Sequence, residues 1–235
     1  MDPLISIIDD NGVERFLGNI DAPLKFSWPV YGDVPTAPVF PRSDWKDLVG
    51  TNTGPDDPYL GPAHDQDGIG MCNASATVSA MERRRVALGL EYIALSGGDL
   101  YKRISGGVDR GSLLEDGIRE AMKGIASVAV VPYLDWRGNY PEAVNDRKRF
   151  VVLEAWLCPD YNRFYSAALA GFDLINGIMW YSNYKPDSEG WLPAYGQGAP
   201  GGHAIHGYKP TYRGNTFGIW HKQSWGNWGP IGNGR

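Results

Sequence analysis

The segment Gln66–Ala74 limits the fold more than any other part of this 235-residue chain, because it leads directly into a long helical pattern. Cys72 stands where that helix begins, and we expect an amphipathic helix that ends near Leu88, with Ala76, Met81, Val86 and Leu88 among its core positions. A thiol there feels the positive end of the helix dipole and backbone N–H groups without intrahelical acceptors, which favour the thiolate. Gln66 is placed to donate its amide N–H to an oxyanion beside the sulfur, together with the Cys72 N–H. The segment predicts a nucleophilic cysteine; the alternative is a small buried thiol on an amphipathic helix.

Two segments far downstream complete the pattern. Gly201–Ile205 carries a histidine followed by small and apolar residues, and Gln223–Gly229 reads Gln-Ser-Trp-Gly-Asn-Trp-Gly. With the cysteine segment they resemble the papain-like cysteine peptidases, over about residues 41 to 235. The interval from Cys72 to His203 is 203 − 72 = 131 residues, inside that family's interval of about 130–150. The matching residues are Gln66, Gly70, Cys72, His203, Ser224, Trp225, Gly226, Trp228 and Gly229.

The resemblance implies an α+β fold with two lobes. The N-terminal lobe would be helical and the C-terminal lobe β-rich and barrel-like, with the active site in the cleft between them. We expect residues 1–40 to form an N-terminal arm and residues 41–235 to form the catalytic domain. Within that domain, the helical lobe would span roughly 41–135 and the β-rich lobe 136–235.

The resemblance also implies a mechanism. His203 would take the Cys72 proton, and the resulting thiolate–imidazolium pair would attack a peptide carbonyl to give a thioester. Gln66 would stabilise the oxyanion, and a third side chain would orient the imidazole. The family uses Asn for that third role, whereas this chain has Gln223 directly before the Ser-Trp-Gly motif. Because glutamine is one methylene longer, we expect a weaker and less rigid orienting group.

Three further residues are expected to bind substrate or shape its groove: Gly70, Gly111 and Trp225. By alignment, Gly111 occupies the place where family members pair a glycine backbone with an extended substrate; a plain flexible turn is the equal alternative. Trp225 in the family shields the hydrogen bond of the catalytic histidine from water. Asn73 replaces the aromatic residue that usually follows the nucleophile, which removes part of an apolar wall.

Local patterns predict the remaining elements. Residues 4–8 and 13–17 flank an Asn-Gly pair and predict a β-hairpin, and the five prolines of residues 22–41 predict an extended segment. This arm would pack on the surface or lie across the cleft. Ser96 is expected to cap a helix. Further helices are predicted over residues 112–123 and 161–170, and strands over residues 150–153, 171–181, 203–208 and 216–222.

Composition limits partners and compartment. With 22 basic and 27 acidic side chains the formal charge is −5, and no basic block indicates nucleic-acid binding. No apolar run is long enough to span a membrane, and no signal peptide is evident. Pairing Cys72 with Cys158, the two cysteines of the chain, would remove the nucleophile, so we read both as reduced and expect a cytoplasmic protein. A bacterial or phage origin is a hypothesis that rests on the family resemblance alone. We expect a peptide or protein substrate and no cofactor; the oligomeric state stays open.

The other histidines offer no metal site. His203 and His206 would point to opposite faces of a strand, and no further ligands complete a set. His64 and His221 are expected to be loop and surface residues. One alternative to a peptidase stays open, namely a catalytically weak or silent papain-like fold that serves as a binding or structural module. A thiol amidase of the peptidoglycan hydrolase kind is a third possibility, but Gln66 and the Trp-Gly motifs argue against it.

Overall fold

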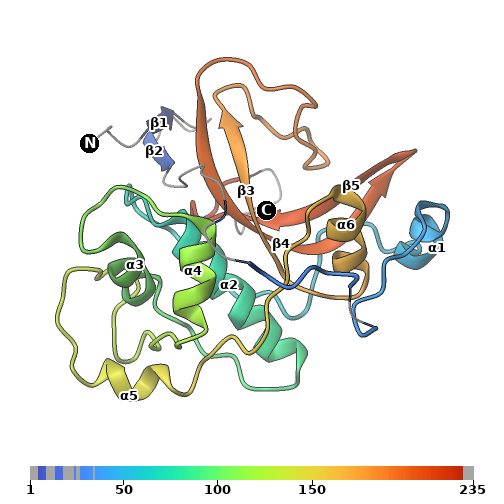
Figure 1. The fold of residues 1–235 in the computed structure, drawn as a ribbon. Helices are drawn as coiled ribbons and strands as arrows, with labels where there is room; N and C mark the ends of the chain where they lie inside the picture. The colour runs from blue at the N-terminus through green and yellow to red at the C-terminus, as the bar shows by residue number, and fades with distance from the viewer. Residues whose placement is uncertain (1–4, 9–13, 18–23, 25–26, 34, 230–235) are drawn as a thin grey trace.

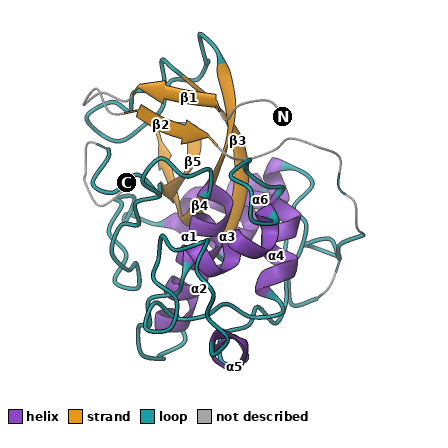
Figure 2. Ribbon diagram, turned by 90° about the vertical axis from the view of Figure 1, so that its left-hand side faces the viewer, coloured by secondary structure: helices purple, strands orange, loops and turns teal. Residues whose placement is uncertain are grey.

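The computed structural model describes residues 5–8, 14–17, 24, 27–33 and 35–229. Helices α2 to α5 gather on one side and an antiparallel sheet stands on the other (Figure 1). The view from the side shows the same division, with strands above the helices (Figure 2). The helices are α1 (Trp45–Val49), α2 (Cys72–Ala87), α3 (Gly97–Ser105), α4 (Leu114–Ala121), α5 (Ala143–Arg147) and α6 (Tyr161–Leu169), with a 3-10 turn over Arg42–Asp44. The strands are β1 (Ile5–Ile8), β2 (Glu14–Leu17), β3 (Leu174–Tyr181), β4 (Pro200–Arg213) and β5 (Thr216–Lys222).

The larger sheet has the order β3-β4-β5, and both pairings are antiparallel. Its register places His203 opposite Ile178, and His206 opposite Lys222. The pairing of β4 with β5 is interrupted by a bulge between Gly207 and Lys209. The α+β prediction is confirmed, but the described strands form an open three-stranded sheet and do not close into a barrel.

Helix α2 runs through the middle of the molecule and confirms the predicted helix, although its character differs from the prediction. An amphipathic helix was expected, yet residues 72–80 are buried on every side. Contacts with α3, α4, β3 and β4 surround this part of the helix, so it has no solvent face. Small side chains such as Ala74 and Ala76 allow that close packing. The exposed end lies beyond them, where Leu88 is 61% exposed although we expected it in the core.

Side-chain contacts cross the predicted division at residue 135. Trp45 of α1 stacks on Tyr165 of α6, with ring centroids 4.2 Å apart, so residues near 45 lie beside the sheet. Helix α5 lies with the other helices instead, because Arg147 forms an ion pair with the buried Asp99. The predicted strand over 150–153 is wrong: its backbone bonds to the α4 region, through Val152 N to Ala121 O, instead of to a sheet.

The N-terminal hairpin is confirmed. Strand β1 pairs antiparallel with β2, with Ile5 opposite Leu17, while the predicted Asn-Gly turn lies outside the described residues. Strand β2 lies against β4, the strand that carries His203 (Figure 1). The arm therefore reaches the sheet side of the molecule; its crossing of a substrate cleft stays a prediction.

Two local predictions can be checked directly. Ser96 caps α3, since its side-chain oxygen accepts a hydrogen bond from the Asp99 backbone N–H at 3.0 Å. Helix α6 and strands β3 and β5 occupy the predicted segments within a few residues. Within the described part of the chain, we find no helix with the length and apolar character that crossing a bilayer requires.

Candidate active site

Cys72 lies where the helical side meets the sheet. It is the first residue of α2, and its side chain is fully buried. The Ala204 backbone N–H of β4 points at the Cys72 sulfur, with N and Sγ 3.4 Å apart. Cys72 also packs with Ala76 and Ala204 in one small apolar cluster. The fold therefore brings the helix that bears the cysteine against the strand that bears His203, although 132 residues separate Cys72 from Ala204.

His203 is held by Gln223. The Nε2 atom of His203 and the Oε1 atom of Gln223 are 2.6 Å apart, and both residues are buried. Because the amide oxygen can only accept, Nε2 carries the ring proton and Nδ1 is the basic nitrogen. Nδ1 is buried and has no hydrogen-bond partner among the described residues. Gln223 thus makes the contact expected of an orienting amide, and its extra methylene does not lengthen that contact.

Trp225 covers the histidine. Its ring stacks on His203 with centroids 4.6 Å apart and planes 26° apart, and Trp180 meets the same imidazole edge-on at 5.7 Å. Trp225, Trp180 and Trp228 form a buried aromatic cluster behind the imidazole. This packing fits the shielding role that the resemblance implies. Trp225 is only 1% exposed, so it presents no surface to a substrate in this structure.

Burial sets the protonation of this histidine. It lowers the pKa of His203 to about 4, against the smaller opposing effect of the Gln223 hydrogen bond. At neutral pH the ring is therefore a neutral base that is ready to accept a proton. An ion pair with Cys72 forms only when the thiol proton moves to Nδ1. By contrast, Cys158 lies in an apolar cluster, where burial raises its pKa to about 11.

Gln66 is anchored by three contacts near the sulfur. Its side-chain nitrogen donates to Ile69 O at 2.7 Å, and its side-chain oxygen accepts from Ser224 Oγ at 2.5 Å. Its backbone N–H also donates to Ser224 O at 2.9 Å. The loop that carries Gln66 is thereby tied to the Ser-Trp-Gly motif. The side-chain amide nitrogen of Gln66 carries two N–H groups, and one of them donates to Ile69 O within the loop.

Gly70 and Gly111 are joined by one hydrogen-bond network that we did not predict. Gly70 N donates to Asp109 Oδ1 at 3.0 Å, and Tyr101 Oη donates to the same oxygen at 2.6 Å. Gly111 N in turn donates to Tyr101 Oη at 3.2 Å. Gly111 has φ +72°, a conformation that glycine adopts without strain. The structure thus connects the loop before Cys72 to the loop of Gly111, and each glycine N–H already has an intramolecular acceptor.

Asn73 has a different place from the one we expected. It is fully buried and faces the helical side, where its amide donates to Ser112 Oγ at 3.1 Å and Leu113 O at 2.6 Å. Gly117 of α4 lies so close that a Cβ there would come within 2.6 Å of Asn73 Oδ1. The substitution for an aromatic residue therefore ties α2 to the segment after Gly111. No sequence signal distinguished this role from loss of an apolar wall.

Two histidines expected at the surface are partly buried in networks. His64 Nε2 lies 2.8 Å from Glu82 Oε2, and the His64 ring stacks on Tyr133 at 4.6 Å. His221 lies on β5, with its Nε2 atom 3.2 Å from Asn176 Oδ1. Both predictions are corrected by the way α2 and the sheet enclose these segments. Within the described ranges no group of three or more His, Cys, Asp or Glu side chains is arranged to hold a metal ion.

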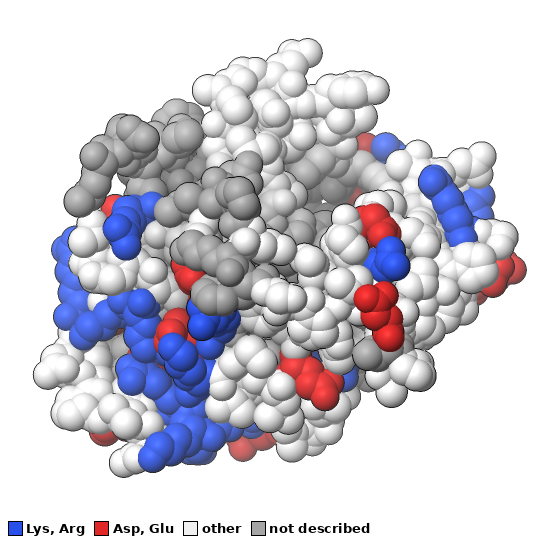
Figure 3. All heavy atoms as spheres, viewed as in Figure 1, with Lys and Arg blue, Asp and Glu red and all other residues white. Residues whose placement is uncertain are grey.

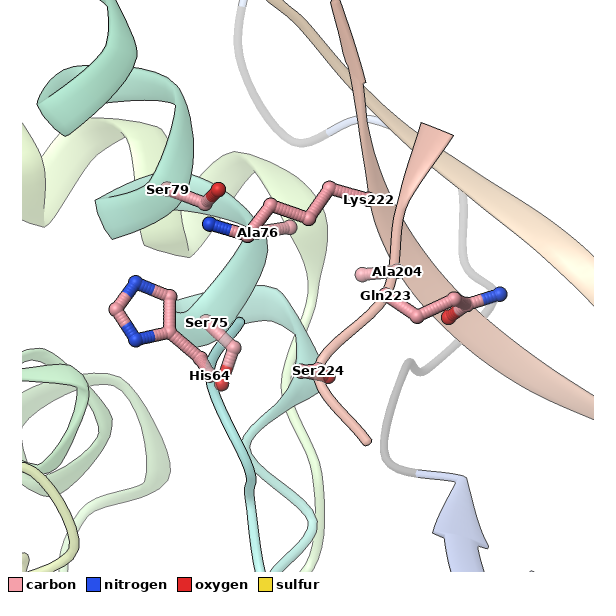
Figure 4. A pocket seen from close by; sticks show the side chains of 8 residues that line it. All are labelled: His64, Ser75, Ala76, Ser79, Ala204, Lys222, Gln223 and Ser224. Carbon is pink, nitrogen blue, oxygen red and sulfur yellow. The ribbon is translucent and has the colours of Figure 1, made fainter. Parts of the chain in front are cut away.

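A small pocket lies next to the candidate site (Figure 4). It separates α2, which contributes Ser75, Ala76 and Ser79, from the end of β5. Lys222 points across it toward the helix, whereas Gln223 points the opposite way (Figure 4). Neither Cys72 nor His203 lines it, so this pocket is not the substrate groove. The pocket instead marks where the two sides of the molecule meet through small and polar side chains.

We expect the protein to lose stability as pH falls from about 7 to about 5. Burial, followed by the charge of His206, lowers the pKa of His221 to about 4 from 6.5. The unfolded chain therefore takes up the proton first, so this stabilisation is complete above pH 6.5 and is lost as pH falls toward 4. Urea unfolding at both pH values should show a loss of at most roughly 2 kcal/mol for this histidine.

The matching variant for that measurement is His221→Asn, which should reduce the pH dependence of the free energy of unfolding. His203 adds a loss of the same sign, because burial also lowers its pKa to about 4. Equal stability of the parent protein at the two pH values would contradict the prediction.

The helices, the antiparallel sheet and the Cys–His–Gln set between them define a papain-like fold, as the sequence resemblance implied. Comparison with solved structures agrees. The chain is similar to xylellain, a cysteine protease from Xylella fastidiosa, with a TM-score of 0.68 and 17% identity over 92% of this chain and 87% of that one. It is also similar to procathepsin B S9 from Trypanosoma congolense, with a TM-score of 0.58 and 16% identity over 92% and 75% of the two chains.

A third similar structure is procathepsin L 3 of the Tenebrio molitor larval midgut, with a TM-score of 0.61 and 17% identity. That match covers 74% of this chain and 60% of the other. At these identities the likeness establishes the fold alone. No protein-family model and no curated protein sequence matches the chain.

Proposed function

We propose that this protein is a cysteine peptidase that hydrolyses peptide bonds through Cys72 and His203. One observation carries the proposal: Gln223 holds His203 by Nε2, while the basic Nδ1 is left without a hydrogen-bond partner in the described structure. The cysteine sulfur accepts a hydrogen bond from the residue after that histidine. Thiol activation requires a base in a fixed tautomer that can reach the sulfur, and here the base is the residue directly before the one that contacts the sulfur.

The chemistry follows from these positions. His203 Nδ1 takes the Cys72 proton, and the sulfur attacks the substrate carbonyl to form a tetrahedral oxyanion. The Cys72 N–H at the start of α2 and the Gln66 amide stabilise that oxyanion. His203 then returns the proton to the leaving amine, and water hydrolyses the thioester to regenerate the thiol. Gln223 keeps the imidazole oriented throughout.

One observation favours a second candidate, a silent papain-like module. Cys72 and His203 are both 0% exposed in this structure, so a substrate carbonyl has no path to the sulfur without movement of the surrounding chain. A binding or structural protein has no need of such movement. The two candidates therefore differ in whether the thiol is accessible and poised in solution.

We propose a peptide or protein substrate rather than a nucleic acid. Lys and Arg side chains do gather on one face of the molecule over the helices (Figure 3). Two arginines of these helices are ion-paired, however: Arg103 of α3 with Glu120, and Arg147 of α5 with the buried Asp99. These pairs reduce the positive charge that a phosphate backbone would meet. Because neither Cys72 nor Cys158 is in a disulfide, we also propose a reducing compartment.

The proposal is tested by competition between the two thiols for iodoacetamide near neutral pH. Cys158 serves as the internal control, since its pKa of about 11 leaves it almost entirely protonated. We expect Cys72 to be alkylated at least about tenfold faster, because its thiolate is stabilised by the helix start and His203. Peptide mapping by mass spectrometry measures both rates, and hydrolysis of a fluorogenic peptide is followed in parallel.

The outcomes separate the candidates. Hydrolysis that falls in step with Cys72 alkylation supports the peptidase. Hydrolysis that continues after complete alkylation of Cys72 would rule out the proposed peptidase mechanism. The silent module would instead be established if the folded protein hydrolyses no peptide and iodoacetamide alkylates Cys72 no faster than Cys158.

A further inference from the structure

A second hydrogen-bonded line joins α2 to the sheet, apart from the Cys72 contact. Ser79 Oγ lies 3.0 Å from His206 Nδ1, and His206 Nε2 lies 2.8 Å from Asp173 Oδ1. Asp173 also accepts a hydrogen bond from Arg83 Nη1 at 3.0 Å. Arg83 is held in turn by Asp57, at 2.8 Å. These hydrogen bonds therefore connect Ser79 of α2 to His206 of β4, and they lead through Asp173 back to Arg83 of α2.

One face of α2 makes all of these contacts. Cys72, Ala76, Ser79 and Arg83 follow the spacing i, i+4, i+7, i+11, which keeps them on one side of a helix. At its first position, Cys72 Sγ meets Ala204 N, and two turns later Ser79 meets His206. Ala76 lies between these two contacts and has only a methyl group, so it permits close approach. Figure 4 shows Ser79 and Ala76 on the side of the helix that faces the pocket.

The chemistry of the line fixes its proton positions. The carboxylate of Asp173 can only accept, so His206 Nε2 carries a proton and Nδ1 accepts from the Ser79 hydroxyl. The order Ser–His–Asp is that of a hydrolytic triad. Ser79 is nevertheless buried in the middle of a helix, and Arg83 occupies the Asp173 oxygen that orients His206. Because Ser79 lies in the contact between α2 and β4 and the carboxylate that orients His206 is shared with Arg83, we assign the line to positioning and not to nucleophilic chemistry.

We propose that Ser79, His206 and Asp173 form a clamp that sets the approach of Cys72 to His203, as positioning residues for the reaction. The inference rests on the proposed peptidase function. His206 is three residues from His203 on β4, and Ser79 is two helical turns from Cys72. A helix held to a strand at two points cannot slide or rotate against it. The first contact lies at the reacting sulfur, and the clamp supplies the second.

The variant that tests the clamp is Ser79→Ala, made in a Cys158→Ala background so that Cys72 is the only thiol. We expect kcat to fall about tenfold with KM nearly unchanged, because small displacements of reacting groups reduce rates steeply. The apparent pKa of Cys72, read from the pH dependence of alkylation, should rise. Ser79→Thr, which restores a hydroxyl, should recover both quantities.

The matched control is Thr77→Val on the same helix. Thr77 is buried like Ser79, but its hydroxyl donates to Asn73 O within α2 at 2.8 Å and does not reach the sheet. This control should keep the parent kcat and alkylation profile. A folded Ser79→Ala variant with parent values would overturn the clamp, and so would a Thr77→Val variant with the same losses.

A separate readout distinguishes failure of the clamp from failure of the peptidase. If the parent hydrolyses no peptide and its thiol is not poised, the proposed function fails. Histidine ring NMR then judges the clamp without activity, because the ring nitrogens report on tautomer and contacts. We expect Ser79→Ala, but not Thr77→Val, to shift the ring signals of both His206 and His203. Unchanged His203 signals in Ser79→Ala would overturn the clamp in this case also.

Discussion

Replacing His203 with alanine is expected to lower kcat/KM for peptide hydrolysis by about 10³-fold or more. His203 directly precedes Ala204, whose N–H contacts the sulfur, and Gln223 presents the imidazole in a single tautomer. Without the imidazole, the proposed mechanism has no base to take the Cys72 proton during attack and no proton donor for the leaving amine. The measurement is the initial rate on a fluorogenic peptide, with circular dichroism to confirm that the variant is folded.

His221→Ala is the control for this experiment. His221 lies on the same sheet and also has a pKa lowered to about 4, but it contacts Asn176 and not the site. Its loss should leave kcat/KM within about threefold of the parent, as expected of a residue outside the reaction. Parent-like hydrolysis in His203→Ala would refute the proposed mechanism.

Trp45→Ala should cost about 3–5 kcal/mol of the free energy of unfolding, as for other large aromatic deletions in cores. Trp45 is buried between α1, α6 and β5: it stacks on Tyr165 and meets Phe217 edge-on at 5.1 Å. Its indole N–H also donates to Phe40 O at 3.0 Å, so the substitution removes the donor of a partly buried carbonyl. Urea unfolding at neutral pH measures the change.

The comparison variant is Tyr195→Ala, since Tyr195 is 84% exposed on the segment between β3 and β4. Its effect should stay within about 0.5 kcal/mol. If Trp45→Ala were no more destabilising than Tyr195→Ala, α1 would not be part of the folded core, and the placement of residues near 45 beside the sheet would be wrong.

The parts of the fold that could be predicted from the sequence are those in which a single residue determines the local structure. Ser96 predicts a cap because a hydroxyl satisfies free N–H groups, and the structure confirms it. Residues 150–153 are apolar and extended, yet they bond to the α4 region instead of a sheet. An apolar run does not specify its partner, because tertiary contacts decide which backbone groups it meets.

The candidate site divides in a similar way. Cys72, His203 and Gln223 stand in motifs of chemically constrained residues, so their meeting could be anticipated over more than a hundred residues of intervening chain. The clamp could not be anticipated. Ser79 and His206 carry no motif, and only the close packing of α2 on β4 brings the hydroxyl to the imidazole. A buried polar pair depends on inter-element distance, which periodicity does not report.

The short contact between Gln223 and His203 has a consequence for how such sites diverge. The oxygen that receives the ring proton occupies its working position even though its side chain is one carbon longer than the family's asparagine. Either the main chain behind it stands farther back or the side chain folds to take up the extra carbon. A motif can therefore change its residue type while the hydrogen-bonding atom keeps its place, so relatives with this fold are better compared by the positions of such atoms than by residue identity.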